Sequence, residues 1–304
     1  MVDGLAMRYG DKVAVDDLTL TVEPQTITAV LGPNGAGKTT TLETCEGYRR
    51  PQRGRVQVLG LDPVKDRRAL LPRIGVMLQQ GGAWSGVRAM EMLHHVARLH
   101  AHPLDVDALA ERLGLGDCGS TPYRRLSGGQ QQRLGLATAV VGRPEVVFVD
   151  EPTAGMDPQA RRNTWELLTE LREDGVTVVL TTHYMDEAER LADRIHIIDH
   201  GRLIASGSPL ELTRGGTVST IRLVVTRPFP PGAPESLRHT LGAETEVTQL
   251  DEVSLLVTGP ADASTLAKVS RWCEECGVLP ESLTLGQGTL EDVFLRLTGR
   301  ELAP

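Results

Sequence analysis

The chain has 304 residues, of which 40% are hydrophobic and 24% charged, and its formal net charge is −8. This length and composition predict a globular protein of one large domain or two. The acidic balance disfavours a nucleic-acid partner, because proteins that bind the phosphate backbone usually carry an excess of Lys and Arg. No run approaches the ~18 apolar residues of a membrane helix, and the N-terminus lacks a signal-peptide pattern. We therefore expect a protein that stays in the cytoplasm.

The first 80 residues predict several strands and one helix. Two β-branched runs within 11–31 are typical of strands around a turn at Glu23–Gln25. A Gly-rich loop follows, and we expect a helix over 38–47. Further strands are expected at 54–60 and 73–79.

The middle of the chain changes to helical spacing and then to an alternating pattern. Apolar residues recur at helical spacing over 87–115, and a further helix is expected over 130–141. Beyond it, predicted strands and helices alternate, in the order strand 145–150, helix 159–173, strand 176–183, helix 186–192 and strand 194–201. Continuous apolar strands interleaved with helices predict a parallel sheet that is covered on both faces.

The composition changes near Gly215–Gly216, where a second unit begins. From residue 218 the pattern predicts strand, helix, strand, strand, helix and strand, with one more helix over 289–298. This order is typical of a small α+β domain of the ferredoxin-like type. We therefore predict a first domain over 1–215 and a C-terminal domain over 216–304.

A phosphate-binding loop is predicted at 32–40, where the sequence reads GPNGAGKTT after a predicted strand and before a predicted helix. Its glycines let the backbone turn tightly, so that N–H groups and the helix N-terminus face the phosphates of a nucleotide. Lys38 would reach the β- and γ-phosphates, and the Thr39 hydroxyl would bind Mg²⁺. The motif predicts that a nucleoside triphosphate contacts Gly32, Pro33, Asn34, Gly35, Ala36, Gly37, Lys38, Thr39 and Thr40.

Two acidic residues end the predicted strand VVFVDE at 146–151. In a parallel sheet the carboxyl ends of the strands form the crevice that binds ligands. Asp150 would then hold Mg²⁺, and Glu151 would orient and deprotonate an attacking water. Together with the loop, the pair predicts hydrolysis of the triphosphate.

Two other clusters suggest metal or redox chemistry. The CEEC stretch at 273–276 is compatible with half of a zinc site or a redox pair, but no second CxxC accompanies it, which favours an ordinary helix. The other cluster contains His94, His95, His100 and His102. None of these histidines is paired at i, i+4, and adjacent helical positions point about 100° apart, so a solvated or partner-facing helix is favoured.

A second anion-binding pattern, RLSGGQQQR at 125–133, has a serine and two glycines that open a predicted helix. VVFVDEPTAGMD follows at 146–157 and TTH at 181–183. In this order and spacing, residues 3–210 resemble the ATP-binding cassette (ABC) ATPases, and the end TLEDVFLRLTGREL resembles their drug-exporter branch. The resemblance implies an α/β P-loop NTPase with a parallel-sheet core, a helical subdomain inserted at about 87–142 and a small C-terminal α+β domain.

The resemblance also implies roles for individual residues. Tyr9 would stack on the adenine of ATP, and His183 would contact the γ-phosphate. Gln79, or Gln80 beside it, would touch Mg²⁺ and the attacking water. Asp157 would lie in the loop that crosses to a partner cassette. Ser127, Gly128, Gly129 and Gln130 would cap the γ-phosphate of ATP held by that partner, so each chain would complete the site of another.

The expected function is that of an ATP-binding and ATP-hydrolysing exporter subunit at the cytoplasmic face of the cell membrane. It would couple ATP-driven pairing with a second copy of itself, or with a similar cassette, to efflux of a drug or other hydrophobic compound. Because no membrane span is predicted, efflux requires separately encoded integral-membrane permease subunits, and no nucleic-acid partner is expected. The segment GGAWSGV at 81–87 departs from the family pattern. Trp84 is therefore open to two interpretations, a docking residue or a core residue.

The sequence disfavours two other functions. A soluble cassette ATPase that acts on ribosomes or nucleic acid is disfavoured by the single phosphate loop, the lack of heptads and the acidic charge. A small GTPase or kinase is disfavoured because no N-K-x-D motif is present, and neither class needs LSGGQ.

Overall fold

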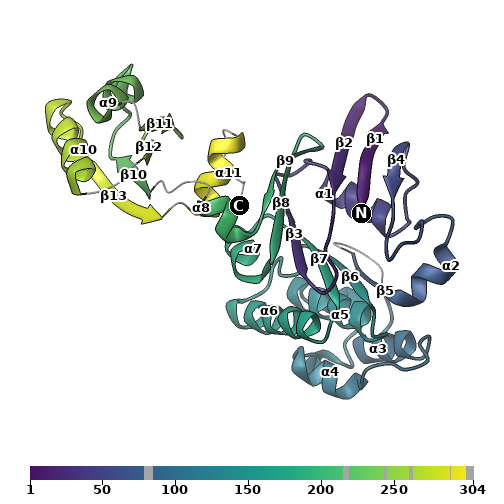
Figure 1. Cartoon of the computed structure of the whole chain (residues 1–304). Helices are drawn as coiled ribbons and strands as arrows, with labels where there is room; N and C mark the ends of the chain where they lie inside the picture. The colour runs from purple at the N-terminus through teal and green to yellow at the C-terminus, as the bar shows by residue number, and fades with distance from the viewer. Residues whose placement is uncertain (79–84, 215–218, 243–244, 260–262, 288, 299–304) are drawn as a thin grey trace. The chain divides into compact units, whose positions relative to one another are not determined.

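The computed structural model describes residues 1–78, 85–214, 219–242, 245–259, 263–287 and 289–298 (Figure 1). The chain forms two compact units that divide between Ser206 and Gly207, upstream of the expected boundary at 215. Residues 207–214 belong to the second unit because they include α8 (Pro209–Arg214). This helix contacts the final helix of the same unit, α11 (Leu290–Thr298).

A six-stranded sheet forms the centre of the first unit. Its central strands are buried throughout or nearly so, as expected where helices cover both faces of a sheet, whereas the edge strand Arg202–Gly207 is mostly exposed or half-buried. The pairs from β5 to β8 run parallel. In spatial order the strands are β5 (Ile74–Met77), β6 (Val146–Asp150), β7 (Thr177–Thr182), β3 (Ile27–Leu31), β8 (Arg194–Asp199) and β9 (Arg202–Gly207). The predicted parallel sheet is confirmed.

A smaller antiparallel sheet joins this core through the first helix. It orders its strands as β2 (Lys12–Leu20), β1 (Val2–Tyr9) and β4 (Arg53–Val56). Leu5 and Leu18 of this sheet, Leu42 of α1 (Lys38–Cys45) and Phe148 of β6 belong to one hydrophobic core. This core fixes the start of α1 against the carboxyl end of the parallel sheet.

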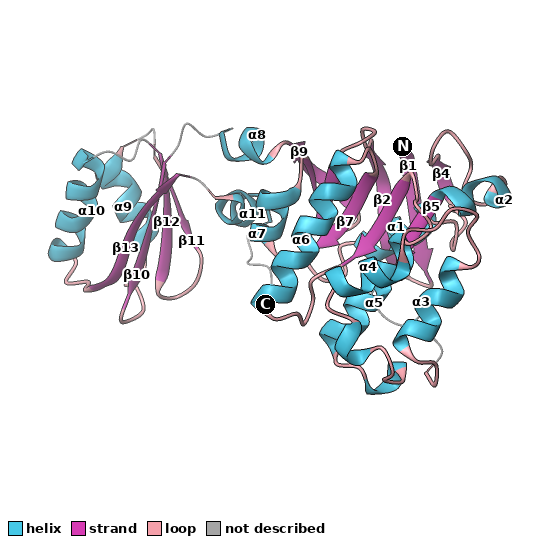
Figure 2. Cartoon of the chain, turned by 90° about the horizontal axis from the view of Figure 1, so that it is seen from below, coloured by secondary structure: helices cyan, strands magenta, loops and turns pink. Residues whose placement is uncertain are grey.

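Helices surround the parallel sheet, as Figure 2 shows. The stretch 87–115, predicted to have helical spacing, contains two helices, because residues around Pro103 leave the helical path between them. A helix at the expected position 130–141 begins two residues earlier, since Ser127 caps it. The elements are α2 (Arg67–Leu70), α3 (Ala89–Ala97), α4 (Val106–Arg112), α5 (Gly128–Val140), α6 (Pro158–Glu173), α7 (Met185–Leu191) and three short 3₁₀ turns at Leu71–Arg73, Gly116–Cys118 and Tyr123–Arg125.

The second unit has the predicted ferredoxin-like order. In chain order it contains β10 (Ser219–Val225), α9 (Ala233–Leu241), β11 (Glu246–Gln249), β12 (Ser254–Gly259), α10 (Ala263–Glu275) and β13 (Pro280–Gln287), followed by α11. The strands form an antiparallel sheet in the order β11-β12-β10-β13. Ile221, Leu237 and Trp272 pack together between this sheet and its helices. The small α+β domain is confirmed.

His94 and His95 lie on α3 and Cys273 lies on α10, whereas His100, His102 and Cys276 lie beyond the ends of these helices. In the CEEC stretch Cys273 is buried and Cys276 is exposed. A ring nitrogen of His94 lies 2.9 Å from the Met90 carbonyl oxygen one turn earlier. Across the described ranges no three His, Cys, Asp or Glu side chains gather as a metal site would require. No helix in those ranges has the length and apolarity that crossing a membrane demands.

Candidate active site

The loop 32–37 connects β3 to α1 and requires glycine at two positions of close approach. A Cβ on Gly32 would lie 2.3 Å from the Ile198 carbonyl oxygen, and one on Gly37 would lie 2.4 Å from that of Ala14. Gly37 also has φ of 102°, a left-handed conformation that glycine adopts without steric strain. The backbone therefore turns directly into α1, whose first residues Lys38, Thr39 and Thr40 line the cleft.

Lys38, the first residue of α1, is only 6% exposed. Its Nζ donates hydrogen bonds to the carbonyl oxygens of Gly32 (2.6 Å) and Pro33 (3.2 Å). Burial lowers the pKa of Lys38, and the nearby charges of Glu151 and Asp150 oppose that shift. The ammonium is thus held over the loop, in surroundings that favour a compensating anion.

Asp150 at the end of β6 accepts hydrogen bonds from two hydroxyl groups. Thr39 Oγ1 donates to Asp150 Oδ2 over 3.1 Å, and Thr181 Oγ1 donates to Oδ1. Burial raises the pKa of Asp150, whereas these two hydrogen bonds lower it. A carboxylate beside a threonine hydroxyl offers the hard oxygen ligands that Mg²⁺ prefers, so the residues present fit that ion.

Glu151 and His183 lie next to each other at the same sheet edge. Nδ1 of His183 is 3.2 Å from Oε1 of Glu151, and the two side chains are 17% and 11% exposed. The contact is close, but it does not have hydrogen-bond alignment at Nδ1. The backbone of Glu151 has φ of 50°, which is uncommon for a residue with a side chain. Its N–H donates to the Thr181 carbonyl oxygen over 3.1 Å, which holds the turn.

Lys38, Thr39 and Glu151 border one cleft. The full lining of this cleft is Tyr9, Lys12, Ala14, Asn34, Gly35, Gly37, Lys38, Thr39, Thr40 and Glu151. Tyr9 at the end of β1 is 41% exposed. The guanidinium carbon of Arg49 lies 5.0 Å from the centroid of the Tyr9 ring, and Arg49 also pairs with Glu43 of α1. An exposed aromatic ring, a phosphate loop and a carboxylate therefore border one cavity.

Comparison with known proteins identifies the family. A family model described as "ABC transporter" matches residues 15–154. The chain is also 40% identical to the daunorubicin resistance ATP-binding protein DrrA3 of Streptomyces coeruleorubidus, over 98% of this chain and 95% of that protein. The chain belongs to the ABC transporter family. The resemblance drawn from the order of the motifs is confirmed.

Another curated protein and two solved structures are also similar to this chain. Nod factor export ATP-binding protein I of Burkholderia thailandensis is 39% identical, over 97% of this chain and 95% of that protein. A solved ATP-binding subunit of an ABC transporter superposes with a TM-score of 0.64 at 25% identity, over 70% of this chain and 91% of its own. A dimeric post-hydrolysis cassette bound to ADP and Pi shares the fold at 23% identity, with a TM-score of 0.62 over 68% of this chain and 97% of its own.

The cassette is therefore an ATP-binding and ATP-hydrolysing subunit, as the phosphate loop and the DE pair at 150–151 predict. The full-length relatives are resistance and export ATP-binding proteins. The alternative function on ribosomes or nucleic acid is not favoured by these relatives.

Ser127 of the LSGGQ stretch begins α5 and does not line the cleft of its own cassette. Its Oγ accepts a hydrogen bond from the Gln130 N–H (3.3 Å), and Gln130 Oε1 accepts one from the Ser127 N–H (2.9 Å). This reciprocal pair is a capping box, which stabilises the first turn of a helix. Gly128 and Gly129 occupy that turn, so the segment is ordered but lies outside this cleft.

Asp157 also caps a helix. Its Oδ1 accepts hydrogen bonds from the N–H groups of Gln159 (3.0 Å) and Ala160 (2.9 Å) at the start of α6. The Ala160 N–H is the largest cause of the lowered pKa of Asp157. Like Ser127, Asp157 does not line the cleft of its own cassette.

A buried carboxylate connects the loop 151–157 to the segment after His183. Glu187 of α7 is fully buried, and its Oε1 accepts hydrogen bonds from Thr153 Oγ1 (2.9 Å) and Trp165 Nε1 (3.0 Å). Burial raises the pKa of Glu187. Sequence reasoning missed this network, because the three residues come from separate segments.

Thr181 and Arg49 were also missed. Thr181 is the direct neighbour of Asp150 across β6 and β7, a relation that depends on strand order. A weak signal existed for Thr181, since alternate strand residues share a face and His183 lies two positions later. The predicted ligand Gln79, its alternative Gln80 and Trp84 lie outside the described residues.

Proposed function

We propose that the cassette powers the efflux of a drug or other hydrophobic compound through separate integral-membrane permease subunits. The observation that carries the proposal is the alignment, over nearly the whole chain, with proteins named for daunorubicin resistance and Nod factor export. Because the described chain has no helix that could span a membrane, the pathway must come from a partner. The cassette would act at the cytoplasmic face of the membrane.

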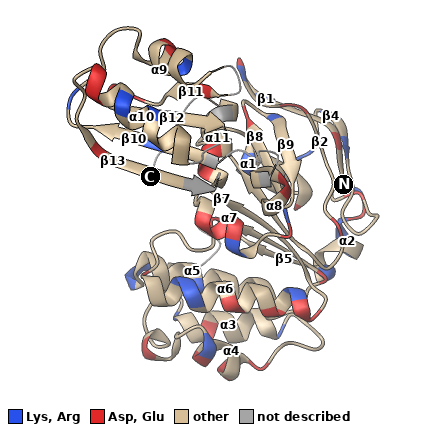
Figure 3. Cartoon of the chain, turned by 60° about the vertical axis from the view of Figure 1, so that its left-hand side comes forward, with Lys and Arg blue, Asp and Glu red and all other residues tan. Residues whose placement is uncertain are grey.

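A nucleic-acid partner does not fit the charge distribution of α6. Figure 3 shows acidic and basic residues interspersed along α6 rather than gathered as one basic face. Arg161 and Arg162 share this helix with Glu166, Glu170 and Glu173. Phosphate-backbone binding needs clustered positive charge.

Mg²⁺ would be held by Thr39 and Asp150, with Gln79 as a further ligand that remains a prediction. When bound, the ion supplies positive charge to the phosphate oxygens. Thr181 would hold Asp150 in place through its hydroxyl group, because it donates to the oxygen that Thr39 does not contact. Tyr9 would stack on adenine at the exposed end of the cleft.

Glu151 would act as the general base, taking a proton from the water that attacks the γ-phosphate. His183, 3.2 Å from Glu151 through Nδ1, would hydrogen bond to the γ-phosphate from Nε2. Lys38 would exchange its two loop carbonyl partners for phosphate oxygens as ATP enters. Lys38 and His183 would then stabilise the negative charge of the transition state.

A second cassette would complete the site. Ser127 to Gln130 and Asp157 are ordered helix starts outside the cleft of their own chain. A helix N-terminus favours a bound anion, so the Ser127 segment fits the γ-phosphate of ATP held by the other cassette. Hydrolysis would then require the dimer, and the monomer would be inactive.

Mixing two inactive variants tests this arrangement. Lys38→Ala removes the phosphate contact within a chain, and Ser127→Arg blocks the segment offered to the partner. Each variant alone should hydrolyse little ATP. In a one-to-one mixture the chains pair at random, and about a quarter of the ATP sites should be intact and active. A mixture as inactive as its components would contradict the shared site, and full activity of Ser127→Arg alone would do the same.

Export is tested in cells that produce the cassette with its permease. Intracellular accumulation of hydrophobic fluorescent compounds, daunorubicin among them, should fall relative to cells producing the Glu151→Gln variant and the same permease. Equal accumulation across the whole panel would reject drug efflux while leaving the ATPase assignment intact.

The C-terminal unit, from Gly207, is proposed to stabilise the dimer or to dock the permease. It has its own sheet and core. Truncation after Ser206 should weaken assembly but leave ATP binding by the first unit. Unchanged assembly in sedimentation experiments would reject this role.

A further inference from the structure

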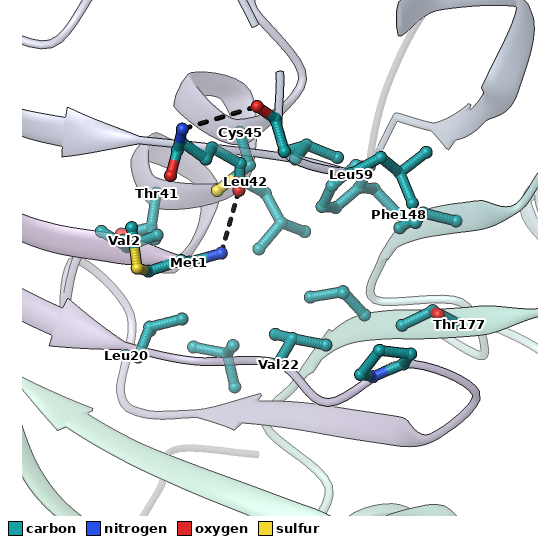
Figure 4. Close-up of a pocket in the computed structure, with 17 residues that line it drawn as sticks. Met1, Val2, Leu20, Val22, Thr41, Leu42, Cys45, Leu59, Phe148 and Thr177 are labelled. Atoms are coloured by element: carbon teal, nitrogen blue, oxygen red, sulfur yellow. Dashed lines mark hydrogen bonds between the residues drawn. The ribbon is translucent and has the colours of Figure 1, made fainter. Parts of the chain in front are cut away.

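A second cavity lies between the antiparallel sheet and the parallel sheet, with α1 as one wall (Figure 4). Its volume is about 290 Å³. Figure 4 shows Thr41, Leu42 and Cys45 of α1 on one side and Leu20 and Val22 on the opposite side. This cavity shares no lining residue with the ATP cleft. It is therefore a separate space next to the helix that begins at Lys38.

The remaining walls are formed by the parallel sheet. Val30 of β3, Phe148 of β6 and Val179 of β7 line the cavity and are almost completely buried. Protein interiors pack as tightly as organic crystals, and voids larger than one water molecule are few. This cavity is partly open to solvent, and both sheets contribute buried apolar side chains to its walls.

The side chains of the walls carry no charge, whereas the terminal amino group of Met1, which lies in the wall, is charged. Among the described residues that line the cavity, none has an ionisable side chain except Cys45. Burial raises the pKa of the Cys45 thiol to about 12, so the thiol stays neutral. The terminal amino group of Met1 donates to the Gln57 carbonyl oxygen over 2.9 Å, as the dashed line in Figure 4 shows. Apart from this amino group, which already donates to Gln57, a charged ligand would find no counter-ion among the described residues of the wall.

The polar side chains in the wall are already engaged within the protein. The Thr41 hydroxyl donates to the Gly37 carbonyl oxygen (2.8 Å), and the Thr177 hydroxyl accepts from the Gln25 N–H (2.9 Å). The Gln57 amide donates to the Gly60 carbonyl oxygen over 3.5 Å. A buried water needs two to four polar partners, so these walls favour an apolar occupant over water.

We propose that this cavity is a binding site for a compact, uncharged, apolar molecule of about two to three aromatic rings. An apolar cavity of roughly half this volume stays dry and holds one benzene molecule, which sets the scale. The occupant would pack against Leu42 and Cys45 of α1 and against Phe148, without entering the ATP cleft. The site is independent of the proposed transport role, because none of its residues takes part in ATP hydrolysis.

Titration of the full chain with N-phenyl-1-naphthylamine tests the proposal. This probe is uncharged and apolar, and its fluorescence rises when it leaves water. The wild-type chain should show one saturable site per chain. Val22→Trp fills the cavity from one side and Cys45→Met from the other, and each should weaken binding at least tenfold. Ile204→Trp, at a 40% exposed position outside the cavity, is the matched control and should bind as the wild type does.

Circular dichroism would verify that each variant is folded, and Cys45→Met carries the test if Val22→Trp does not fold. The titration is repeated with saturating ATP to separate the two cavities. Probe binding that survives both filling variants, or the lack of a saturable site in the wild type, would overturn the proposal. If ATP displaced the probe competitively, the probe would lie in the nucleotide cleft, and this result would also overturn the proposal.

Discussion

Arg49 lies against the ring of Tyr9, with its guanidinium carbon 5.0 Å from the ring centroid, and Glu43 of α1 pairs with the same guanidinium. The hydrogen bond to Glu43 is the main cause of the raised pKa of Arg49, so this guanidinium remains charged. Tyr9 lines the ATP cleft, whereas Arg49 does not. The cation thus contacts the ring from outside the cleft and connects it to the phosphate-loop helix.

Substitution of Arg49 by Met should weaken ATP binding about two- to fivefold, which corresponds to the loss of one exposed cation–π contact. Affinity for inorganic tripolyphosphate, which has no base to stack, should not change. Calorimetry with both ligands measures the difference. Arg50→Met, at the exposed neighbouring position, is the control. Tighter ATP binding by Arg49→Met would show that the guanidinium occupies the place of adenine.

Glu151→Gln should reduce the rate of ATP hydrolysis at least about 100-fold, because the amide cannot accept the proton of the attacking water. ATP should still bind, and dimers should accumulate with bound ATP. A phosphate-release assay and size-exclusion chromatography report the two effects. Glu166→Gln, at an exposed position of α6, should keep wild-type activity. Near-normal hydrolysis by Glu151→Gln would refute the role of this carboxylate.

Glu187→Ala should lower the free energy of unfolding by about 1–3 kcal/mol, because it leaves the Thr153 hydroxyl and the Trp165 N–H without their acceptor. Urea unfolding followed by circular dichroism measures the change. Glu189→Ala alters an exposed residue of the same helix and should change stability little. Equal effects of the two substitutions would mean that the buried network contributes no specific stability.

Glu46 predicts a pH dependence of stability. Burial, and then the charges of Asp150 and Glu43, raise the pKa of Glu46 from 4.5 to about 8. The stabilisation by neutral Glu46 is therefore fully present below pH 4.5 and is lost as the pH rises towards 8. Each unit of difference between the folded and unfolded pKa of Glu46 changes the free energy of unfolding by about 1.4 kcal/mol at most.

Glu46→Gln should consequently stabilise the cassette at pH 8 and change little at pH 5. Melting temperatures of both proteins across this range provide the measurement, with the exposed Glu145→Gln as a control for a surface carboxylate. A difference between Glu46→Gln and wild type that does not vary with pH would contradict the assignment.

Most features of the fold and the candidate site that the sequence predicts come from local motifs. Gly32, Gly37 and Lys38 are contiguous in sequence, so one pattern contains the turn, the helix start and the phosphate contact. The order of strands and helices along the second unit was predicted because its elements follow one another without long insertions. The contact of Thr181 with Asp150 was not predictable in the same way, since it requires β6 and β7 to be neighbours.

Contacts that depend on how elements pack could not be predicted from the sequence either. Arg49 meets Tyr9 because the chain after α1 returns past the end of β1, where Gln52 hydrogen bonds to Arg8. The apolar cavity depends on how closely two sheets approach, which side-chain identity alone does not reveal. The roles of Gln79, Ser127 and Asp157 remain predictions from the family pattern.

The capping box of Ser127 and Gln130 has a consequence for kinetics. Its two hydrogen bonds exist within a single chain, so the surface offered to a second cassette is preorganised and needs no folding step. Association of two ATP-loaded chains would then proceed at the rate of an ordinary rigid encounter, about 10⁵–10⁷ M⁻¹s⁻¹. Dissociation after hydrolysis would leave that surface intact, ready for the next collision.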